Sequence, residues 1–264
     1  MVTNNDTTVS GATGARGGYA DVNGLHMYYE TYGSGTPLVL LHGGMLSIDL
    51  NFAELIPSLA TRHQVIAVEM QGHGRTADIP REITPAALAQ DIVALLDHLG
   101  IDRAHVLGHS MGAAVALEMA VSYPDRVRSV VPISASVRPD GMHEDFTDPE
   151  RMATSTRMPT PADFAAMRET YQRLSPHPEH FDEFLGALSA SNADTRGWSD
   201  DQLAGIAAPT LLVIGDHDFV TVDHAALMQR LIPGARLAVL PGTTHMRATH
   251  RVDLLVPMLA EFLD

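Results

Sequence analysis

The stretch AHVLGHSMGAAVALEMA, residues 104–120, decides the fold class. Its first five residues are apolar and typical of a buried strand, and its second half consists of small, helix-prone residues. Between them, Gly108 to Gly112 matches G-x-S-x-G, a tight strand-to-helix turn that exposes a serine. Glycines on both sides of Ser110 leave room for the strained backbone of such a turn. The stretch therefore predicts a nucleophilic serine at the end of a strand.

A serine nucleophile needs a histidine base and an acid that orients the histidine. Both are expected later in the chain, acid first, in loops at the carboxyl ends of strands. The apolar run 209–215 is followed by Asp216 to Asp218, and the run 235–242 is followed by Thr243, Thr244 and His245. We expect His245 to be the base, with His250 as the second choice.

Two carboxyl groups compete for the acid position. Asp218 lies deeper in its loop and can turn back toward a histidine. Asp216 directly follows a glycine and can accept hydrogen bonds from loop amides instead. We expect Asp218 to be the acid, and Asp140, after the preceding strand, is a third choice.

Two backbone amides are expected to form an oxyanion hole, because negative charge develops on the carbonyl oxygen during acyl transfer. Met111 follows the serine at the start of its helix and is one predicted donor. The other comes from the glycine-rich loop His42 to Met45, which follows an apolar run. Gly44 is the expected donor in this loop, with Met45 as the alternative.

The pattern on either side of this stretch predicts a doubly wound, mostly parallel sheet. An Asn23-Gly24 turn within 21–32 predicts an opening β-hairpin. Helical patterns alternate with the later strands, and one begins at an N-capping Thr84 followed by proline. The apolar runs that predict strands buried on both faces are 37–43, 64–70, 104–108, 127–134, 209–215 and 235–242.

One region interrupts this alternation. Residues 138–205 show no clear strand pattern, and pieces such as 161–174 and 178–189 are helix-like, so we expect an inserted helical cap. The catalytic core then comprises 19–137 and 206–264. Residues 1–18 are small and polar without an apolar run, which predicts a disordered tail and not a signal peptide.

Composition excludes several classes of protein. The chain has 264 residues, 45% of them hydrophobic, which suffices for a packed core without disulfides. It has 17 basic and 32 acidic residues and a net charge of −15, so nucleic acid is not an expected partner. Cysteine is absent, which excludes thiol chemistry. With no run of 18 apolar residues, no membrane span is expected, and we predict a cytoplasmic location. The oligomeric state stays open.

Over residues 20–264 the chain resembles the serine esterases of the α/β-hydrolase fold. The resemblance implies Ser110, Asp218 and His245 as a triad, with Gly44 and Met111 as oxyanion donors. Ala113 and Glu69 depart from the family pattern, in which glycine and aspartate are frequent. The motifs that carry the resemblance are LLHGG (40–44), QGHGRT (71–76), GHSMG (108–112), GDHD (215–218) and PGTTHM (241–246).

Methionine is frequent, with thirteen in the chain, and flexible thioethers make adaptable apolar walls. A substrate with a bulky apolar portion is therefore expected. No cofactor and no metal are expected, because His177-Pro178-Glu179-His180 lacks the helical i, i+4 histidine pair of a zinc hydrolase. The predicted substrate-binding residues are Met45, Met142, Met152, Met158, Met167, Tyr171, Trp198 and Met246.

These observations predict a serine hydrolase that cleaves a small carboxylic ester or lactone. Ser110 argues against dehalogenases and epoxide hydrolases of this fold, whose nucleophile is aspartate. A cofactor-free perhydrolase or a carbon–carbon bond hydrolase with the same triad is the first alternative. A non-catalytic ligand-binding protein that retains the fold is the second.

Overall fold

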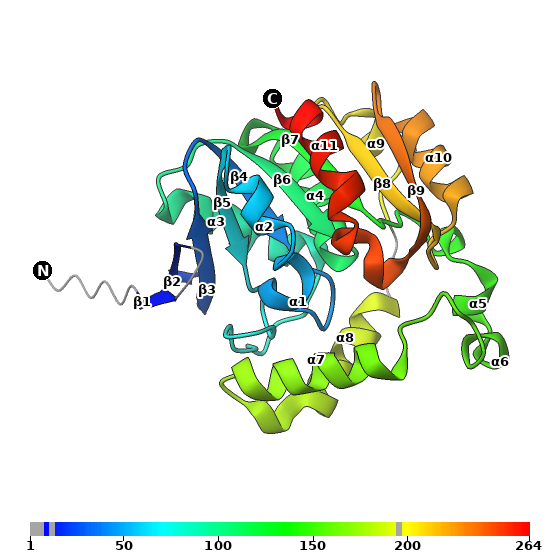
Figure 1. Ribbon diagram of the computed structural model, residues 1–264, viewed down its shortest axis with the longest axis horizontal. Helices are drawn as coiled ribbons and strands as arrows, with labels where there is room; N and C mark the ends of the chain where they lie inside the picture. The colour runs from blue at the N-terminus through cyan, green and yellow to red at the C-terminus, as the bar shows by residue number, and fades with distance from the viewer. Residues whose placement is uncertain (1–7, 11–13, 194–196) are drawn as a thin grey trace, which may run out of the picture.

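The computed structural model describes residues 8–10, 14–193 and 197–264. Within these residues the strands form a nine-stranded sheet in the order β1-β2-β3-β5-β4-β6-β7-β8-β9 (Figure 1). Neighbouring strands are antiparallel from β1 to β5 and parallel from β5 to β9, so the predicted mostly parallel sheet is confirmed. The strands are β1 (Thr8–Ser10), β2 (Ala15–Val22), β3 (Leu25–Tyr32), β4 (Thr36–Leu41), β5 (His63–Val68), β6 (Ala104–His109), β7 (Val127–Ile133), β8 (Leu211–His217) and β9 (Arg236–Thr244).

Strands β2 and β3 form the predicted hairpin. Asn23 and Gly24 connect them with φ angles of 48° and 87°, the left-handed conformation that a tight hairpin turn requires. The predicted tail boundary at residue 18 is wrong, because β2 begins at Ala15. Its small residues have a packing reason: a Cβ built on Gly17 would lie 2.5 Å from the hydroxyl oxygen of Tyr28 on β3. Residues 1–7 and 11–13 of the predicted tail lie outside the described residues.

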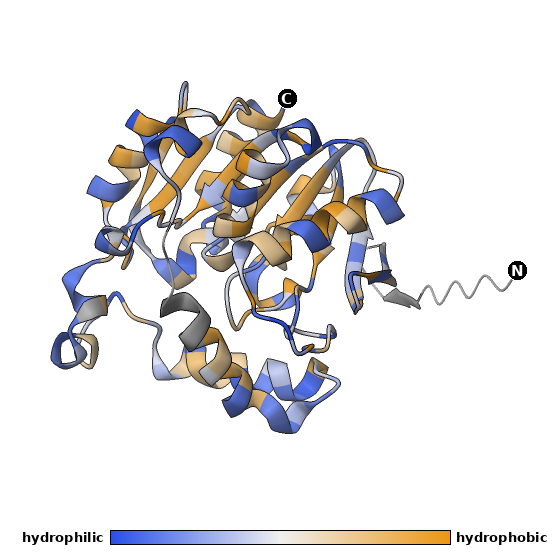
Figure 2. Cartoon of the chain, turned by 180° about the vertical axis from the view of Figure 1, so that it is seen from behind, coloured by the Kyte–Doolittle hydropathy of each residue, from blue (hydrophilic) through white to orange (hydrophobic). Residues whose placement is uncertain are grey.

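Helices cover both faces of the sheet, which makes it doubly wound (Figure 1). Alternate strand residues pack on opposite faces: Val39 and Leu41 of β4 join the core with α3, α4 and α10, and Leu38 and Leu40 join the core with α1, α2 and α11. Figure 2 shows the strands as a hydrophobic layer between helices of mixed polarity. The helices are α1 (Ile48–Phe52), α2 (Ile56–Leu59), α3 (Pro85–His98), α4 (Met111–Ser122), α5 (Glu144–Thr147), α6 (Pro149–Met152), α7 (Pro161–Leu174), α8 (Phe181–Ala193), α9 (Asp200–Ala204), α10 (Val222–Leu231) and α11 (Val252–Leu263).

The capping signals in the sequence position the longer helices. The Thr84 hydroxyl accepts a hydrogen bond from the Ala87 amide at 3.1 Å and starts α3, and Gly100, with a φ of 67°, follows its end. Helix α7 begins with a capping box in which Thr160 and Asp163 bond each other's backbone amides. The predicted segment 178–189 is a 3₁₀ turn, η3 (Pro178–His180), followed by α8, which runs to Ala193.

The insertion between β7 and β8 is helical, as predicted. It contains the 3₁₀ turns η2 (Pro139–Gly141) and η3 and the helices α5 to α9. Met142 forms a single antiparallel bridge with Val220. Figure 1 shows α7 and α8 as a pair beneath the sheet, with α5 and α6 to one side.

The turn at Ser110 is strained and depends on both of its glycines. Ser110 has φ 53° and ψ −114°, a conformation that residues with a Cβ rarely adopt. A Cβ on Gly108 would lie 2.0 Å from the Gly112 carbonyl oxygen. A Cβ on Gly112 would lie 2.1 Å from the carbonyl oxygen of Leu41 on β4. These contacts are with backbone atoms, so neither glycine position leaves room for a side chain.

Replacing Gly112 with alanine is therefore expected to lower the free energy of unfolding by about 3 kcal/mol or more, since backbone atoms must move. Gly186 in α8 is the matched control, because a Cβ there meets nothing within 4 Å. Gly186→Ala is expected to leave stability unchanged or raise it by up to about 1 kcal/mol. Urea unfolding of the two variants checks this, and equal stabilities would contradict the packing argument.

Within the described parts of the chain, we find no helix whose length and hydropathy would let it cross a bilayer.

Candidate active site

Five loops gather at the carboxyl ends of the parallel strands. They follow β4, β6, β7, β8 and β9, and contacts through these residues or their chain neighbours group one residue from each loop into a cluster. The cluster consists of Gly43, Ser110, Ser134, Asp218 and His245. The sequence motifs, which lie far apart in the chain, thus meet at one edge of the sheet.

His245 and Asp218 form a buried hydrogen-bonded pair. His245 Nδ1 lies 2.8 Å from Asp218 Oδ1, and the two residues are 3% and 1% exposed. Burial by itself raises the pKa of Asp218, but the His245 ring and the hydrogen bonds to the carboxylate outweigh it, so the pKa lies below its ordinary value. A carboxylate only accepts, so Nδ1 carries a proton, and in the neutral ring Nε2 is then the nitrogen with the free lone pair. This is the tautomer that a general base needs.

Two further residues fix this pair, and the sequence motifs did not indicate either. Ser134, after β7, donates a hydrogen bond from Oγ to Asp218 Oδ2 at 2.5 Å. The Phe219 ring stacks on the His245 ring with centroids 3.7 Å apart. Ser134 has a φ of 57°, which is the one local sign of its unusual place.

The competing candidates lie elsewhere. Asp216 is exposed and accepts a hydrogen bond from the Thr243 amide at 3.0 Å, the backbone role that its position next to Gly215 indicated. Asp140 is exposed in η2. His250 pairs with exposed Glu54 at 3.1 Å. None of these hydrogen-bonds to His245 in the contacts that the described residues make.

Ser110 is available for chemistry. Its hydroxyl makes no capping hydrogen bond at the start of α4, and the residue is partly exposed. Its neighbour His109 is buried, and His109 Nε2 lies 3.1 Å from the carbonyl oxygen of His245. A Cβ built on Gly43 would lie 3.4 Å from Ser110 Cβ. The turn 109–110 therefore lies between the two loops, with Ser110 beside Gly43 and His109 against the His245 carbonyl oxygen.

The predicted oxyanion donors lie side by side, and the structure distinguishes Gly44 from Met45. The Met45 amide already donates to His73 Nε2 at 3.1 Å. A Cβ built on Gly44 would lie 4.0 Å from Met111 Cβ, so the backbones of Gly44 and Met111 are neighbours. The pair that the sequence suggested is thus the pair that the fold brings together.

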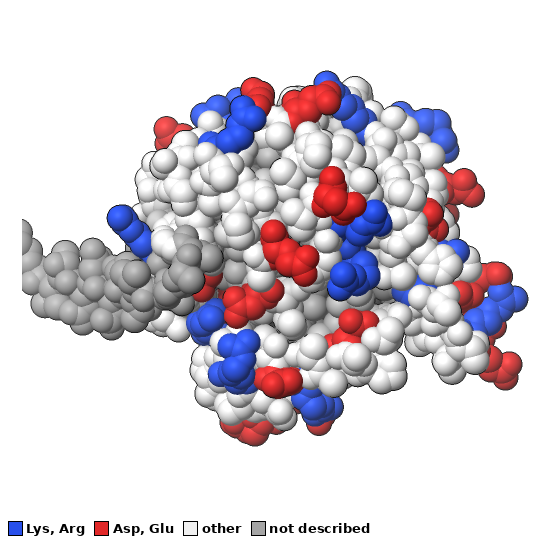
Figure 3. Space-filling model, in the orientation of Figure 1, with Lys and Arg blue, Asp and Glu red and all other residues white. Residues whose placement is uncertain are grey.

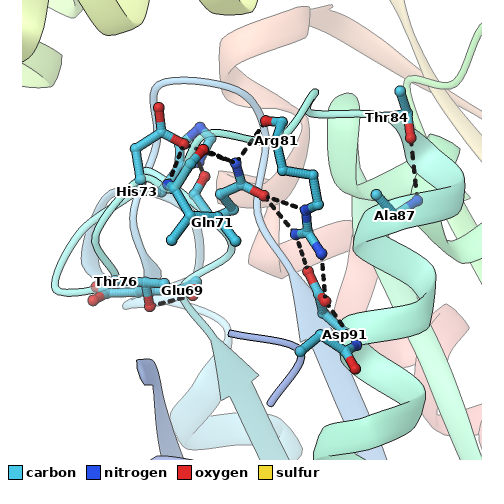
Figure 4. Close-up of polar contacts among 11 residues, drawn as sticks. Glu69, Gln71, His73, Thr76, Arg81, Thr84, Ala87 and Asp91 are labelled. Atoms are coloured by element: carbon cyan, nitrogen blue, oxygen red, sulfur yellow. Dashed lines mark hydrogen bonds and ion pairs between the residues drawn. The ribbon is translucent and has the colours of Figure 1, made fainter. Parts of the chain in front are cut away.

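The loop after β5 contains His73, the partner of the Met45 amide, and Figure 4 shows the polar contacts that hold this loop. His73 Nδ1 donates to the Gln71 carbonyl oxygen at 2.8 Å, which leaves Nε2 to accept from Met45. The Gln71 amide donates to Asp78 at 2.8 Å, and its oxygen accepts from Arg81. Arg81 in turn forms a bidentate pair with buried Asp91 of α3. The loop is therefore anchored to a core helix.

Buried His73 in this loop makes the stability of the protein depend on pH. Burial lowers the pKa of His73 to about 4, against hydrogen bonds that raise it. The unfolded chain takes up this proton near pH 6.5, so the stability from neutral His73 is complete above that pH and is lost as the pH falls toward 4. In His73→Gln, whose amide oxygen can accept from Met45, we expect the fall in stability between pH 6.5 and 5 to be about 2 kcal/mol smaller. Urea unfolding at both pH values checks this, and equal falls would contradict it.

The cap reaches both sides of the cluster. In α8, Leu188 lies 3.2 Å from a Cβ built on Gly44, and the Phe184 ring is 4.9 Å from the His73 ring. The Arg157 guanidinium donates to the Asp218 carbonyl oxygen at 2.9 Å. The inserted segment therefore packs on the oxyanion loop and on the acid loop.

The predicted substrate-binding residues are not all in one place. Met45 and Met246 are partly buried beside the proposed oxyanion donor and His245, and Tyr171 stacks on Phe184. The other cap residues differ in surroundings: Met142 and Met158 pack with Phe219, Met167 is buried in α7, Met152 is 37% exposed, and the Trp198 indole donates to Glu118 of α4 at 2.7 Å.

On the cap surface the structure brings together one set of metal-ligand side chains among the residues it describes. The ligand atoms of His177, Glu179 and His180 lie within 4.8 Å of one another, and all three residues are exposed. Glu179 and His180 lie on η3 and His177 directly precedes it, outside the cluster around Ser110. Figure 3 shows acidic and basic side chains interspersed over one face of the molecule.

Comparisons with known proteins agree with this architecture. Residues 36–166 match the family described as alpha/beta hydrolase fold. RutD of Azorhizobium caulinodans, named as a carbamate hydrolase, is 31% identical, covering 94% of this chain and 97% of that protein. The 2-hydroxy-6-oxo-6-phenylhexa-2,4-dienoate hydrolase of Burkholderia cepacia is 25% identical and covers 92% of both. Est816, described as an N-acyl homoserine lactone degrading enzyme, has a TM-score of 0.73 and 26% identity over 92% of this chain and 99% of its own. The chain belongs to the α/β-hydrolase family.

Proposed function

We propose that the protein is a serine hydrolase that cleaves a carboxylic ester or lactone through an acyl-enzyme on Ser110. The observation that carries the proposal is the buried 2.8 Å pair of Asp218 and His245, next to a strained turn that presents a serine hydroxyl not used as a helix cap. A buried, oriented histidine with an unprotonated Nε2 is the group that a serine nucleophile requires.

In the proposed reaction His245 Nε2 removes the proton from Ser110 Oγ as the oxygen attacks the carbonyl carbon. Asp218 stabilises the imidazolium that forms, and Ser134 stabilises the Asp218 carboxylate. The imidazolium then protonates the leaving alkoxide, which departs as the alcohol. Water, deprotonated by the same histidine, attacks the acyl-enzyme, and collapse of this second intermediate releases the acid and Ser110.

The amides of Gly44 and Met111 are the proposed donors to the oxyanion. Gly44 lies in the loop after β4, and Met111 lies at the start of α4. The Met45 amide already donates a hydrogen bond to His73. Leu188 packs beside Gly44, and the partly buried Met45 and Met246 follow Gly44 and His245 directly in the chain, so apolar side chains are close to the proposed site. An uncharged or apolar acyl or alcohol portion suits these surroundings, as does a lactone ring such as the class named for Est816.

Carbon–carbon bond hydrolysis is the second candidate, because the Burkholderia cepacia relative is named for that reaction. The discriminating experiment compares kcat/KM for p-nitrophenyl esters of increasing acyl length, N-acyl homoserine lactones, a macrocyclic lactone and a vinylogous 1,5-diketone. Peroxide-dependent halide oxidation in acetate tests perhydrolysis on the same preparation. The proposal expects an ester or lactone to exceed the diketone by about 100-fold or more, and the reverse ranking would replace it with the second candidate.

A further inference from the structure

Asn51 is a buried amide at the junction of three loops of the site. It lies in α1, is 2% exposed, and belongs to none of the motifs that predicted the triad. Its Oδ1 accepts a hydrogen bond from the Gly43 amide at 2.7 Å. Its Nδ2 donates to Thr249 Oγ1 at 2.8 Å. One side chain therefore connects the glycine-rich loop with a residue 198 positions along the chain.

The orientation of this amide is fixed by its partners. The Gly43 amide is a donor only, so it requires the oxygen of Asn51, and the nitrogen then faces the Thr249 hydroxyl. Thr249 is 1% exposed and belongs to the 3₁₀ turn η4 (His245–His250), whose first residue is the proposed base. Gly43 directly precedes Gly44, the proposed oxyanion donor. Asn51 thus links the Gly43 backbone amide to the Thr249 side chain, and so joins the loop of the proposed oxyanion donor to the turn of the proposed base.

The nucleophile turn meets the same junction through His109. Its Nδ1 lies 3.2 Å from Asn51 Oδ1, and its Nε2 lies 3.1 Å from the His245 carbonyl oxygen. Burial lowers the pKa of His109 to about 3, so the ring is neutral and has one N–H for these two acceptors. The ring fills the space between the glycine-rich loop and the His245 loop, whichever of its two nitrogens carries the proton.

We propose that Asn51 is a positioning residue, which holds the Gly44 amide in register with His245 and Ser110 by joining Gly43 to Thr249. The inference rests on the proposed serine-hydrolase function. Oxyanion donors act through their distance from the developing charge, and a misplacement of about 1 Å costs on the order of 100-fold in rate. Substrate binding away from the oxyanion is unaffected by this displacement, so the loss falls on kcat and not on KM.

The test compares Asn51→Ala with wild type on the best ester of the panel, with kcat expressed per active site titrated by a fluorophosphonate. Titration removes the contribution of misfolded molecules. Asn51→Ala is expected to lower kcat about 10- to 100-fold and to change KM by less than about threefold. The control for a lost buried hydrogen bond is Ser129→Ala, whose hydroxyl contacts His105 at the other end of the sheet; its kcat per site is expected to stay within about twofold of wild type.

A second pair of variants serves if Asn51→Ala does not fold. Thr249→Ser keeps the hydroxyl that accepts from Asn51, and Thr249→Val removes it at nearly constant volume. The proposal expects Thr249→Val to have at least about threefold lower kcat per site than Thr249→Ser, in line with the loss of one positioning hydrogen bond.

An unchanged kcat per site in Asn51→Ala, or an equal loss of kcat in Ser129→Ala, would overturn the inference. If Asn51→Ala does not fold, equal kcat values per site for Thr249→Ser and Thr249→Val would overturn it. Ser110→Ala is measured in parallel. If it retains turnover, the proposed function itself fails; if it is inactive while Asn51→Ala is fully active, only the positioning role fails.

Discussion

Replacing Ser110 with alanine is expected to lower kcat by at least about 10⁴-fold, because the proposed acyl-enzyme cannot form without Oγ. The protein should still fold, since the hydroxyl makes no capping hydrogen bond at α4 and the φ of 53° is fixed by the surrounding backbone. Initial rates on the best ester of the panel, together with a thermal unfolding curve, measure both quantities.

Ser122 provides the matched control for this substitution. It lies at the other end of α4, where its hydroxyl donates a hydrogen bond to Glu118 Oε1 at 2.6 Å. Ser122→Ala is expected to retain wild-type turnover. More than about 1% residual activity in Ser110→Ala, with an intact fold, would show that another group attacks the substrate.

The second large effect is expected for Asp218→Asn, with kcat about 10³- to 10⁴-fold lower. An asparagine can present an N–H to His245 Nδ1, which favours the tautomer whose Nε2 is protonated and cannot act as a base. The change also removes the negative charge that stabilises the imidazolium. Rates across pH 5 to 9 measure the loss at the pH optimum of each variant.

Asp216→Asn is the control within the same loop. Its side chain accepts from the Thr243 amide and does not reach His245, so a loss of less than about threefold is expected. If Asp216→Asn were as damaging as Asp218→Asn, the assignment of the acid would be wrong.

Most of the parallel sheet could be predicted because its strands are buried on both faces. Continuous apolar runs such as 37–43 and 64–70 have no other place in a chain of this composition, and both form strands. The starts of long helices could be predicted from their capping residues, as for α3 at Thr84. The tail was misjudged because Gly17 and Gly18 looked like linker residues, whereas they leave room for tyrosines on the paired strand.

The residues of the proposed triad could be located because they follow strands, and the fold brings the ends of parallel strands together. Ser134 and Asn51 could not, because their contacts join positions 84 and 198 residues apart and neither has a local motif. The surroundings of the cap methionines were harder to predict, because their spacing does not separate Met142 and Met158, which pack beside Phe219, from exposed Met152. Whether a cap methionine is buried or exposed depends on how the cap packs on the core.

Labelling with a fluorophosphonate tests the central claim, that Ser110 is the nucleophile activated by His245, most directly. The protein is titrated with the reagent, residual ester hydrolysis is measured, and the modified residue is located by tandem mass spectrometry. We expect activity to disappear in proportion to a single adduct on Ser110, and His245→Ala to react far more slowly. Full hydrolytic activity after complete labelling of Ser110, or inactivation with Ser110 unmodified, would contradict the account.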